Sequence, residues 1–169
     1  MKPLAFVLFA LLLAALQAAL LRFVGGGAFS IALPIACVVY VGLHSGNVDG
    51  VVAAAGIGYV MDLVAATPKG LMTFLAVLLF LLVRAVAAAV DVRSRAGYAL
   101  LSGLGALVVS AGSAILLRYV VPPEAAPAGS LVGRMIVEAV LTAAASPAVL
   151  LGMRALDRLF HREEPGLLR

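Results

Sequence analysis

The chain has 169 residues, of which 64% are hydrophobic and only 12% are charged, and its mean hydropathy is +1.19. A soluble domain carries about 25% charged residues, and a surface this apolar exceeds what a soluble monomer tolerates, so the composition predicts a polytopic membrane protein. The formal net charge of +4 is spread over loops and tail and does not indicate nucleic-acid binding, and the single Cys37 excludes an intrachain disulfide and a cysteine-based metal site.

Six apolar runs are predicted to span the membrane, at about residues 3–21, 29–43, 51–66, 71–90, 97–121 and 131–153. Because a span needs about 20 residues, these runs use almost the whole chain and leave no room for a soluble catalytic domain. We therefore expect one all-α membrane domain of six transmembrane helices, followed by a basic tail over residues 154–169. The first run has the basic start of a signal peptide, but its length and the absence of a convincing cleavage site favour a retained span.

Within the first run, Ala14 and Ala18, and likewise Ala15 and Ala19, are spaced four residues apart around Gln17. Small residues at this spacing let two helices approach closely, which predicts a partner contact. A chain this rich in alanine also produces such pairs by chance, so both interpretations stay open.

Proline residues mark two expected irregularities. Pro34 lies near the start of the second run and predicts an irregular or kinked first turn. Ser146-Pro147 is predicted to break the sixth run, which carries Arg134 and Glu138 closer to its start.

The most distinctive stretch is Gly58-Tyr59-Val60-Met61-Asp62-Leu63, which is followed by a corner at Thr67-Pro68-Lys69 and by Gly70. A charged side chain near the centre of a bilayer costs about 2.5–3.5 kcal/mol on insertion scales and usually faces protein or a cavity. We expect the Asp62 carboxylate, the Pro68 corner and the next apolar helix to form one structural unit.

Basic residues predict the orientation of the spans. With both ends in the cytoplasm, the cytoplasmic segments hold seven basic residues, namely Lys2, Arg93, Arg95, Arg154, Arg158, Arg162 and Arg169. The opposite side holds four, namely Arg22, Lys69, Arg118 and Arg134, and Arg84 is counted as intramembrane. Under the positive-inside rule, this difference favours cytoplasmic termini.

Two carboxylates are predicted at similar depth in the outer half of the membrane. At about 1.5 Å per helical residue, Asp62 lies roughly 9 Å before the corner and Glu138 roughly 10 Å below the start of its span. Arg134 is one turn from Glu138, and Arg118 ends the fifth span near the same level. These four side chains predict a buried polar cluster. Its charged side chains would hold helices together or sit at helix ends, dock a partner's transmembrane helix, or form a proton or ion path.

No sequence pattern supports a catalytic reaction. The chain shows no phosphate-binding glycine loop, no serine nucleophile with a plausible base and no paired histidines. We therefore expect a non-enzymatic protein without a cofactor or metal.

The sequence resembles the MreD family of rod shape-determining proteins. The resemblance lies in the small, almost wholly membrane-embedded chain, in Gly58 to Leu63 with its late aspartate, in Gly70 before an apolar span, and in the short basic tail after the last span. At the level of motif it covers mainly residues 50 to 85. Pro34-Ile35 departs from the family pattern, in which a polar or charged residue often follows the proline.

The resemblance implies a scaffold of the bacterial cell-elongation machinery, located in the inner membrane. Such a protein binds MreC directly and belongs to a complex with RodA, a class B penicillin-binding transpeptidase and MreB. The resemblance also implies a fold similar to the six-span substrate-binding subunits of energy-coupling factor transporters, whose first span meets the partner through small residues. In this chain Ala14, Ala15, Ala18 and Ala19 would fit that role.

Two hypotheses from different classes follow. The first is the scaffold, and the second is a transporter subunit that binds a small polar solute near Asp62 and Glu138. A vitamin pocket needs aromatic walls and converging polar groups, whereas this chain has no tryptophan and its aromatic residues do not converge on an obvious site. The sequence therefore favours the scaffold.

Overall fold

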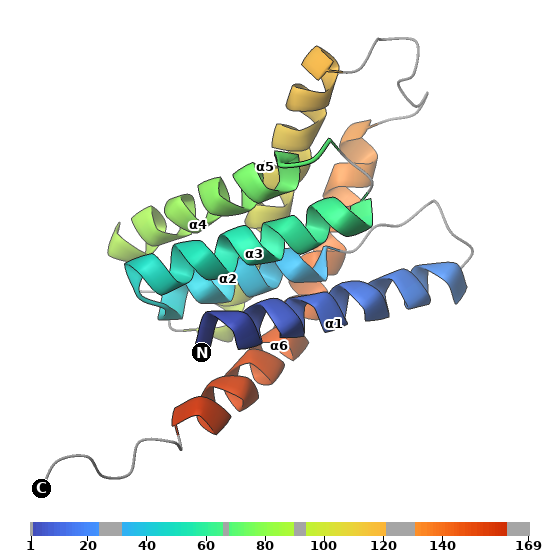
Figure 1. Ribbon diagram of the computed structural model, residues 1–169. Coiled ribbons are helices and arrows are strands. Elements are labelled where there is room, and N and C mark those ends of the chain that lie inside the picture. The colour runs from blue at the N-terminus through green and yellow to red at the C-terminus, as the bar shows by residue number, and fades with distance from the viewer. Residues whose placement is uncertain (1, 24–31, 66–67, 90–93, 121–130, 162–169) are drawn as a thin grey trace, which may run out of the picture.

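The computed structural model describes residues 2–23, 32–65, 68–89, 94–120 and 131–161 (Figure 1). These residues form six α-helices and no strand: α1 (Lys2–Phe23), α2 (Leu33–His44), α3 (Asn47–Ala65), α4 (Leu71–Ala89), α5 (Arg95–Val120) and α6 (Leu131–His161). The helices α3 to α6 are each long and apolar enough to cross a membrane, while α1 and α2 provide the shorter apolar segments Leu4–Ala19 and Leu33–His44. The predicted all-helical fold with six helices is confirmed.

The short helix α2 lies at the centre of the bundle and contacts each of the other five helices (Figure 1). Every residue from Pro34 to Gly42 is buried. Its sequence explains this position, because a helix that is hydrophobic all round has no polar face for water. At about 1.5 Å per residue, its 12 residues extend over roughly 18 Å, less than the ~30 Å of a bilayer's hydrocarbon core. The ends of α2 therefore need hydrogen-bond partners inside the bundle.

The N-terminus of α2 shows how Pro34 is accommodated. The structure places Pro34 in the first helical turn, after the non-helical Ala32. Proline suits this position because its missing N–H would have no acceptor within the helix. The irregular backbone predicted near Pro34 is therefore the start of the helix itself. Residues 29–31 of the predicted span lie outside the described residues.

The predicted break at Ser146-Pro147 does not occur, because α6 runs continuously from Leu131 to His161 with Pro147 inside it. Proline removes the bond that its N–H would donate to the carbonyl four residues earlier, which is that of Ala143. The buried Ser146 hydroxyl donates to this same carbonyl at 2.8 Å. The serine thus supplies the missing donor, and the start of the predicted basic tail, with Arg154 and Arg158, is helical.

Arg84, the arginine inside the fourth apolar run, contacts the turn between α2 and α3. Its guanidinium donates to the Ser45 carbonyl oxygen at 2.6 Å and to the side-chain oxygen of Asn47. The charged head of Arg84 thus joins α4 to the end of α2 and the start of α3.

Candidate functional site

The Asp62 carboxylate binds the N-terminus of the next helix. Its Oδ1 accepts a hydrogen bond from the Met72 N–H at 2.8 Å. Its Oδ2 accepts from the N–H groups of Gly70 and Thr73, each at 3.0 Å, and from the Thr73 hydroxyl at 2.7 Å. Asp62 itself is only 5% exposed. One buried carboxylate of α3 therefore receives four donors from the start of α4.

This arrangement gives hydrogen-bond acceptors to backbone N–H groups that would find none in a bilayer. The first N–H groups of a helix have no acceptor within it, and the helix dipole favours an anion at that end. In hydrocarbon, each unsatisfied backbone group costs several kcal/mol. An aspartate at this position stabilises the α3–α4 hairpin both by charge and by its hydrogen bonds.

The corner that brings Asp62 to α4 depends on Pro68 and Gly70. The Leu71 N–H donates to the Pro68 carbonyl oxygen at 3.2 Å, which closes the turn. Gly70 has a φ of +95°, in the region where a side chain is strained and glycine is not. The structure thus unites Asp62, Pro68 and Gly70 in one unit, while Thr67 lies outside the described residues.

Gly58 lies one helical turn before Asp62 and faces the same neighbour. A Cβ atom added to Gly58 would lie 2.6 Å from the Thr73 Cα and 2.8 Å from the Ala76 Cβ. The backbones of α3 and α4 can therefore approach this closely only at a glycine. Tyr59 and Leu63 lie on the other side of α3 and are exposed, at 60% and 62%.

Glu138 takes part in a different helix pair. Its Oε2 accepts a hydrogen bond from the Ser110 hydroxyl at 3.1 Å, across the packed helices α5 and α6. The main packing partners of α3 are α1, α2 and α4. The structure therefore assigns the two carboxylates of the predicted polar cluster to separate helix pairs. Arg134 is exposed, and the Arg118 side chain lies outside the described ones.

Two capping residues of α2 were not predicted. The Ala32 N–H donates to the Thr142 hydroxyl oxygen of α6, and the Leu33 N–H donates to the Gln17 side-chain oxygen of α1, each at 3.2 Å. Pro34 follows without an N–H. The buried start of α2 is thus capped from two other helices, as the start of α4 is capped by Asp62.

The alanines of α1 divide between two faces. Ala14 is buried at 4% exposure and Ala18 is half-buried, whereas Ala15 and Ala19 are exposed. The exposed side of α1 also carries leucines, namely Leu4, Leu8, Leu11, Leu12 and Leu16. Only Ala15 and Ala19 therefore lie where a partner helix could reach them without displacing the bundle.

Comparisons with protein-family models, with curated proteins and with solved structures find no match to this chain.

Proposed function

We propose that the protein is a non-enzymatic scaffold of the rod-shape and cell-wall elongation complex, of the MreD type. In this proposal it is a multi-pass protein of the bacterial inner membrane with both termini in the cytoplasm. The chain crosses the membrane six times, with the short α2 as the enclosed part of the second crossing, in the arrangement of the substrate-binding subunits of energy-coupling factor transporters. It binds MreC directly and acts in one complex with RodA, a class B penicillin-binding transpeptidase and MreB.

The bonding of the Asp62 carboxylate is the observation that carries this proposal. An intramembrane charge that receives three backbone N–H groups and one hydroxyl has its acceptor capacity used for holding two helices together. Asp62, Gly58 and Gly70 are also the residues by which the sequence resembles MreD. The motif and its geometry therefore agree on a structural role, which suits a scaffold.

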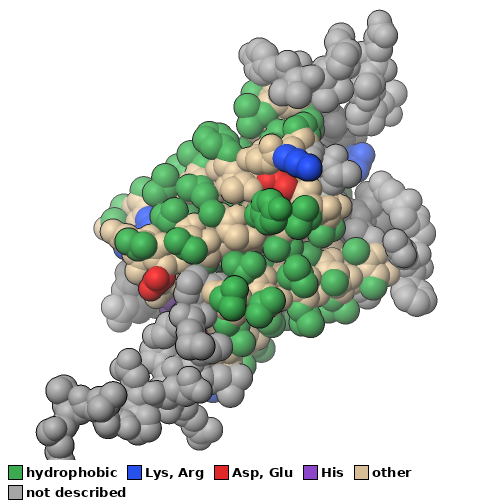
Figure 2. Space-filling view, viewed as in Figure 1, with side chains coloured by type: hydrophobic (Ala, Val, Ile, Leu, Met, Phe, Trp, Pro, Cys, Tyr) green, Lys and Arg blue, Asp and Glu red, His purple; other side chains and the backbone are tan. Residues whose placement is uncertain are grey.

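The exposed helix faces supply the surface that a scaffold needs. Figure 2 shows hydrophobic side chains over α1, α3 and α4 on the visible face. On α3, Tyr59 and Leu63 are exposed beside the Gly58–Asp62 motif, and on α1 the small Ala15 and Ala19 lie among exposed leucines. Close approach at small residues is a common way for transmembrane helices to associate. We propose that the single span of MreC docks on such a face.

The transporter alternative has less support. It relied on Asp62 and Glu138 converging on a solute, whereas Asp62 is bonded to the start of α4 and Glu138 accepts from Ser110. Both carboxylates thus engage protein groups in separate helix pairs.

Co-purification tests the proposal. Tagged full-length protein is expected to bring down MreC from solubilised membranes, and its depletion is expected to round rod-shaped cells. If MreC docks on the exposed face of α3, the variant Tyr59→Ala should reduce MreC recovery, whereas Arg134→Gln, an exposed site on α6, should not. Recovery with an ATPase-coupled transmembrane module, or saturable vitamin binding, would overturn the proposal.

A further inference from the structure

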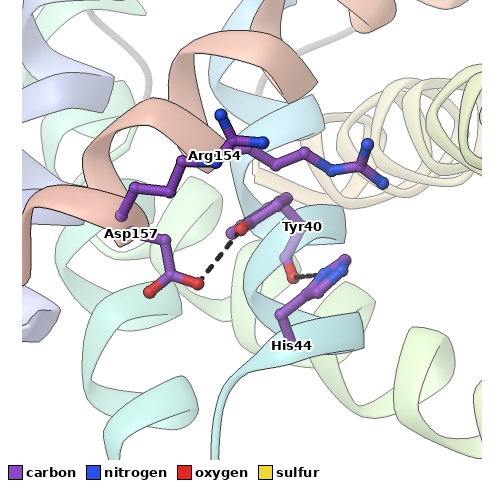
Figure 3. A pocket seen from close by; sticks show the side chains of 5 residues that line it. Tyr40, His44, Arg154 and Asp157 are labelled. Carbon is purple, nitrogen blue, oxygen red and sulfur yellow. Dashed lines mark hydrogen bonds between the residues drawn. The ribbon is translucent and has the colours of Figure 1, made fainter. Parts of the chain in front are cut away.

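A pocket of about 240 Å³ opens where α2 ends beside the last turns of α6. It is lined by Tyr40 and His44 of α2 and by Arg154, Asp157 and Arg158 of α6. Figure 3 shows the Asp157 side chain of α6 pointing at the Tyr40 hydroxyl of α2, with Arg154 of the same helix nearby. The pocket lies at the opposite end of α2 from the caps of Gln17 and Thr142, and the scaffold proposal does not use it.

The two rings form a fixed wall of this pocket. Tyr40 is 1% exposed and stacks on His44, with ring centroids 4.3 Å apart and planes inclined by 13°. The Tyr40 hydroxyl donates to Asp157 Oδ2 at 3.4 Å, and His44 Nδ1 lies 3.2 Å from the Tyr40 carbonyl oxygen. Phe6 of α1 supports Tyr40 from another side by an edge contact, with ring centroids 6.2 Å apart. The wall is therefore held by contacts within α2 and by contacts to two other helices, α1 and α6.

The charge of the pocket favours an anion. Arg154 and Arg158 are four residues apart on α6, a spacing that places both on one side of the helix. Asp157 offsets one of these charges and is itself engaged with the Tyr40 hydroxyl. Two guanidinium groups against one carboxylate leave a net positive lining, and the planar guanidinium matches the oxygens of a phosphate group in two-pronged hydrogen bonds.

Exposed leucines lie in the helix turns next to the pocket. Leu151 is 60% exposed on α6, and Leu4 and Leu8 are 66% and 57% exposed on α1. The two helices meet close by, because a Cβ atom added to Gly152 would lie 2.6 Å from the Phe9 ring. A ligand with a charged head in the pocket could thus lay an apolar tail along this surface. Basic pockets between transmembrane helices at the cytoplasmic side suit anionic headgroups.

We propose that this pocket binds the phosphate group of an anionic ligand, through Arg154 and Arg158. Two sources share this chemistry, an anionic phospholipid headgroup and free phosphate. A cavity of this volume is below the roughly 300–1,000 Å³ of pockets for drug-sized ligands, and it suits a headgroup with its acyl chains outside. The proposal concerns a site that needs no MreC, so its test is separate from that of the scaffold function.

The test measures lipid binding by purified full-length protein in neutral detergent. Fluorescent phosphatidylglycerol and phosphatidylcholine with the same acyl chains serve as probes, read by anisotropy. Each basic residue near a lipid phosphate contributes about 1 kcal/mol, so the double variant Arg154→Gln with Arg158→Gln should bind phosphatidylglycerol about thirtyfold more weakly. Arg134→Gln, exposed at the other end of α6, is the matched control and should bind like the wild type.

Competition separates the two sources. Inorganic phosphate that displaces the lipid probe, when chloride at equal ionic strength does not, identifies a site that free phosphate also occupies. Displacement only by unlabelled phosphatidylglycerol identifies a lipid site. If the double variant fails to fold, the single variant of the exposed Arg158 should still weaken lipid binding about fivefold. Equal affinity for the two lipids, an unchanged preference in the variants, or an equal loss in Arg134→Gln would overturn the proposal.

Discussion

Gly58 of α3 and Thr73 of α4 lie so close that a Cβ atom added to Gly58 would be 2.6 Å from the Thr73 Cα. The same threonine donates its backbone N–H and its hydroxyl to Asp62, one turn along α3. Close backbone approach and helix capping are therefore coupled in this hairpin. If α3 moved away from α4 at Gly58, Asp62 would also move away from the N–H groups that it caps.

Replacing Gly58 by alanine should destabilise the protein by about 1–3 kcal/mol, the usual cost of forcing extra atoms into a well-packed site. The nearest atom is backbone, which cannot rotate aside as a flexible side chain does. Gly46→Ala is the control, because nothing lies within 4 Å of a Cβ atom at Gly46. The buried Cys37, the single cysteine of the chain, gives the measurement, since a thiol-reactive dye labels it only after unfolding. Equal thermal midpoints for the two variants would contradict the prediction.

Asp62→Ala should cost more than Asp62→Asn. Alanine leaves three backbone N–H groups and a hydroxyl of α4 without their acceptor, and each unsatisfied buried group costs about 1–3 kcal/mol. Asparagine, with its oxygen in the Oδ2 position, keeps the three bonds from Gly70 and Thr73, but its amide group then meets the Met72 N–H, a second donor.

The measurement is again the labelling of Cys37 on heating, with Asp49→Asn, an exposed aspartate in the first turn of α3, as the control. The expected order of midpoints is wild type and control, then the asparagine variant, then the alanine variant. An alanine variant as stable as the asparagine variant would mean that the carboxylate does not hold the hairpin.

Local features of the sequence predicted local structure well. Six apolar runs were enough to predict six helices, four of which are long and apolar enough to cross a membrane. The unit of Asp62, Pro68 and Gly70 was predicted because its members are at most eight residues apart, and a corner at Pro68 leaves Asp62 near the next helix start. The break at Pro147 was wrong because the preceding Ser146 replaces the donor that proline lacks.

Features that join distant helices were harder to predict. The sequence predicts similar depths for Asp62 and Glu138, but depth does not fix the side of the bundle to which a helix belongs, and α3 and α6 have different main neighbours. The Ala32–Thr142 bond joins residues 110 positions apart. A signal was available in Pro34, since a proline that starts a short buried helix implies that the N–H groups before it need acceptors from elsewhere.

Removing both caps of α2 should destabilise the bundle more than removing either one. Thr142→Val and Gln17→Leu each leave one N–H of the helix start unsatisfied, at about 1–3 kcal/mol. Ser113→Ala is the control, because the Ser113 hydroxyl donates to Ser110 of its own helix and joins no second helix. Cys37 lies in the second turn of α2 and is fully buried, so its labelling reports directly on this end of the bundle. Cap variants that label no faster than Ser113→Ala would contradict the prediction.

An alanine-to-leucine substitution is expected to have different effects on the two faces of α1. Ala14→Leu forces a large side chain into a site that is 4% exposed, and we expect a loss of about 1–3 kcal/mol in stability. Ala15→Leu and Ala19→Leu add the same atoms on the exposed face, so the fold should keep its thermal midpoint.

If α1 is the docking face of the scaffold proposal, the variants Ala15→Leu and Ala19→Leu should reduce the amount of co-purified MreC, because they remove the small residues that permit close approach. Normal MreC recovery from both would assign docking to another face, such as that of Tyr59 and Leu63 on α3, and the Tyr59→Ala variant then decides between the faces.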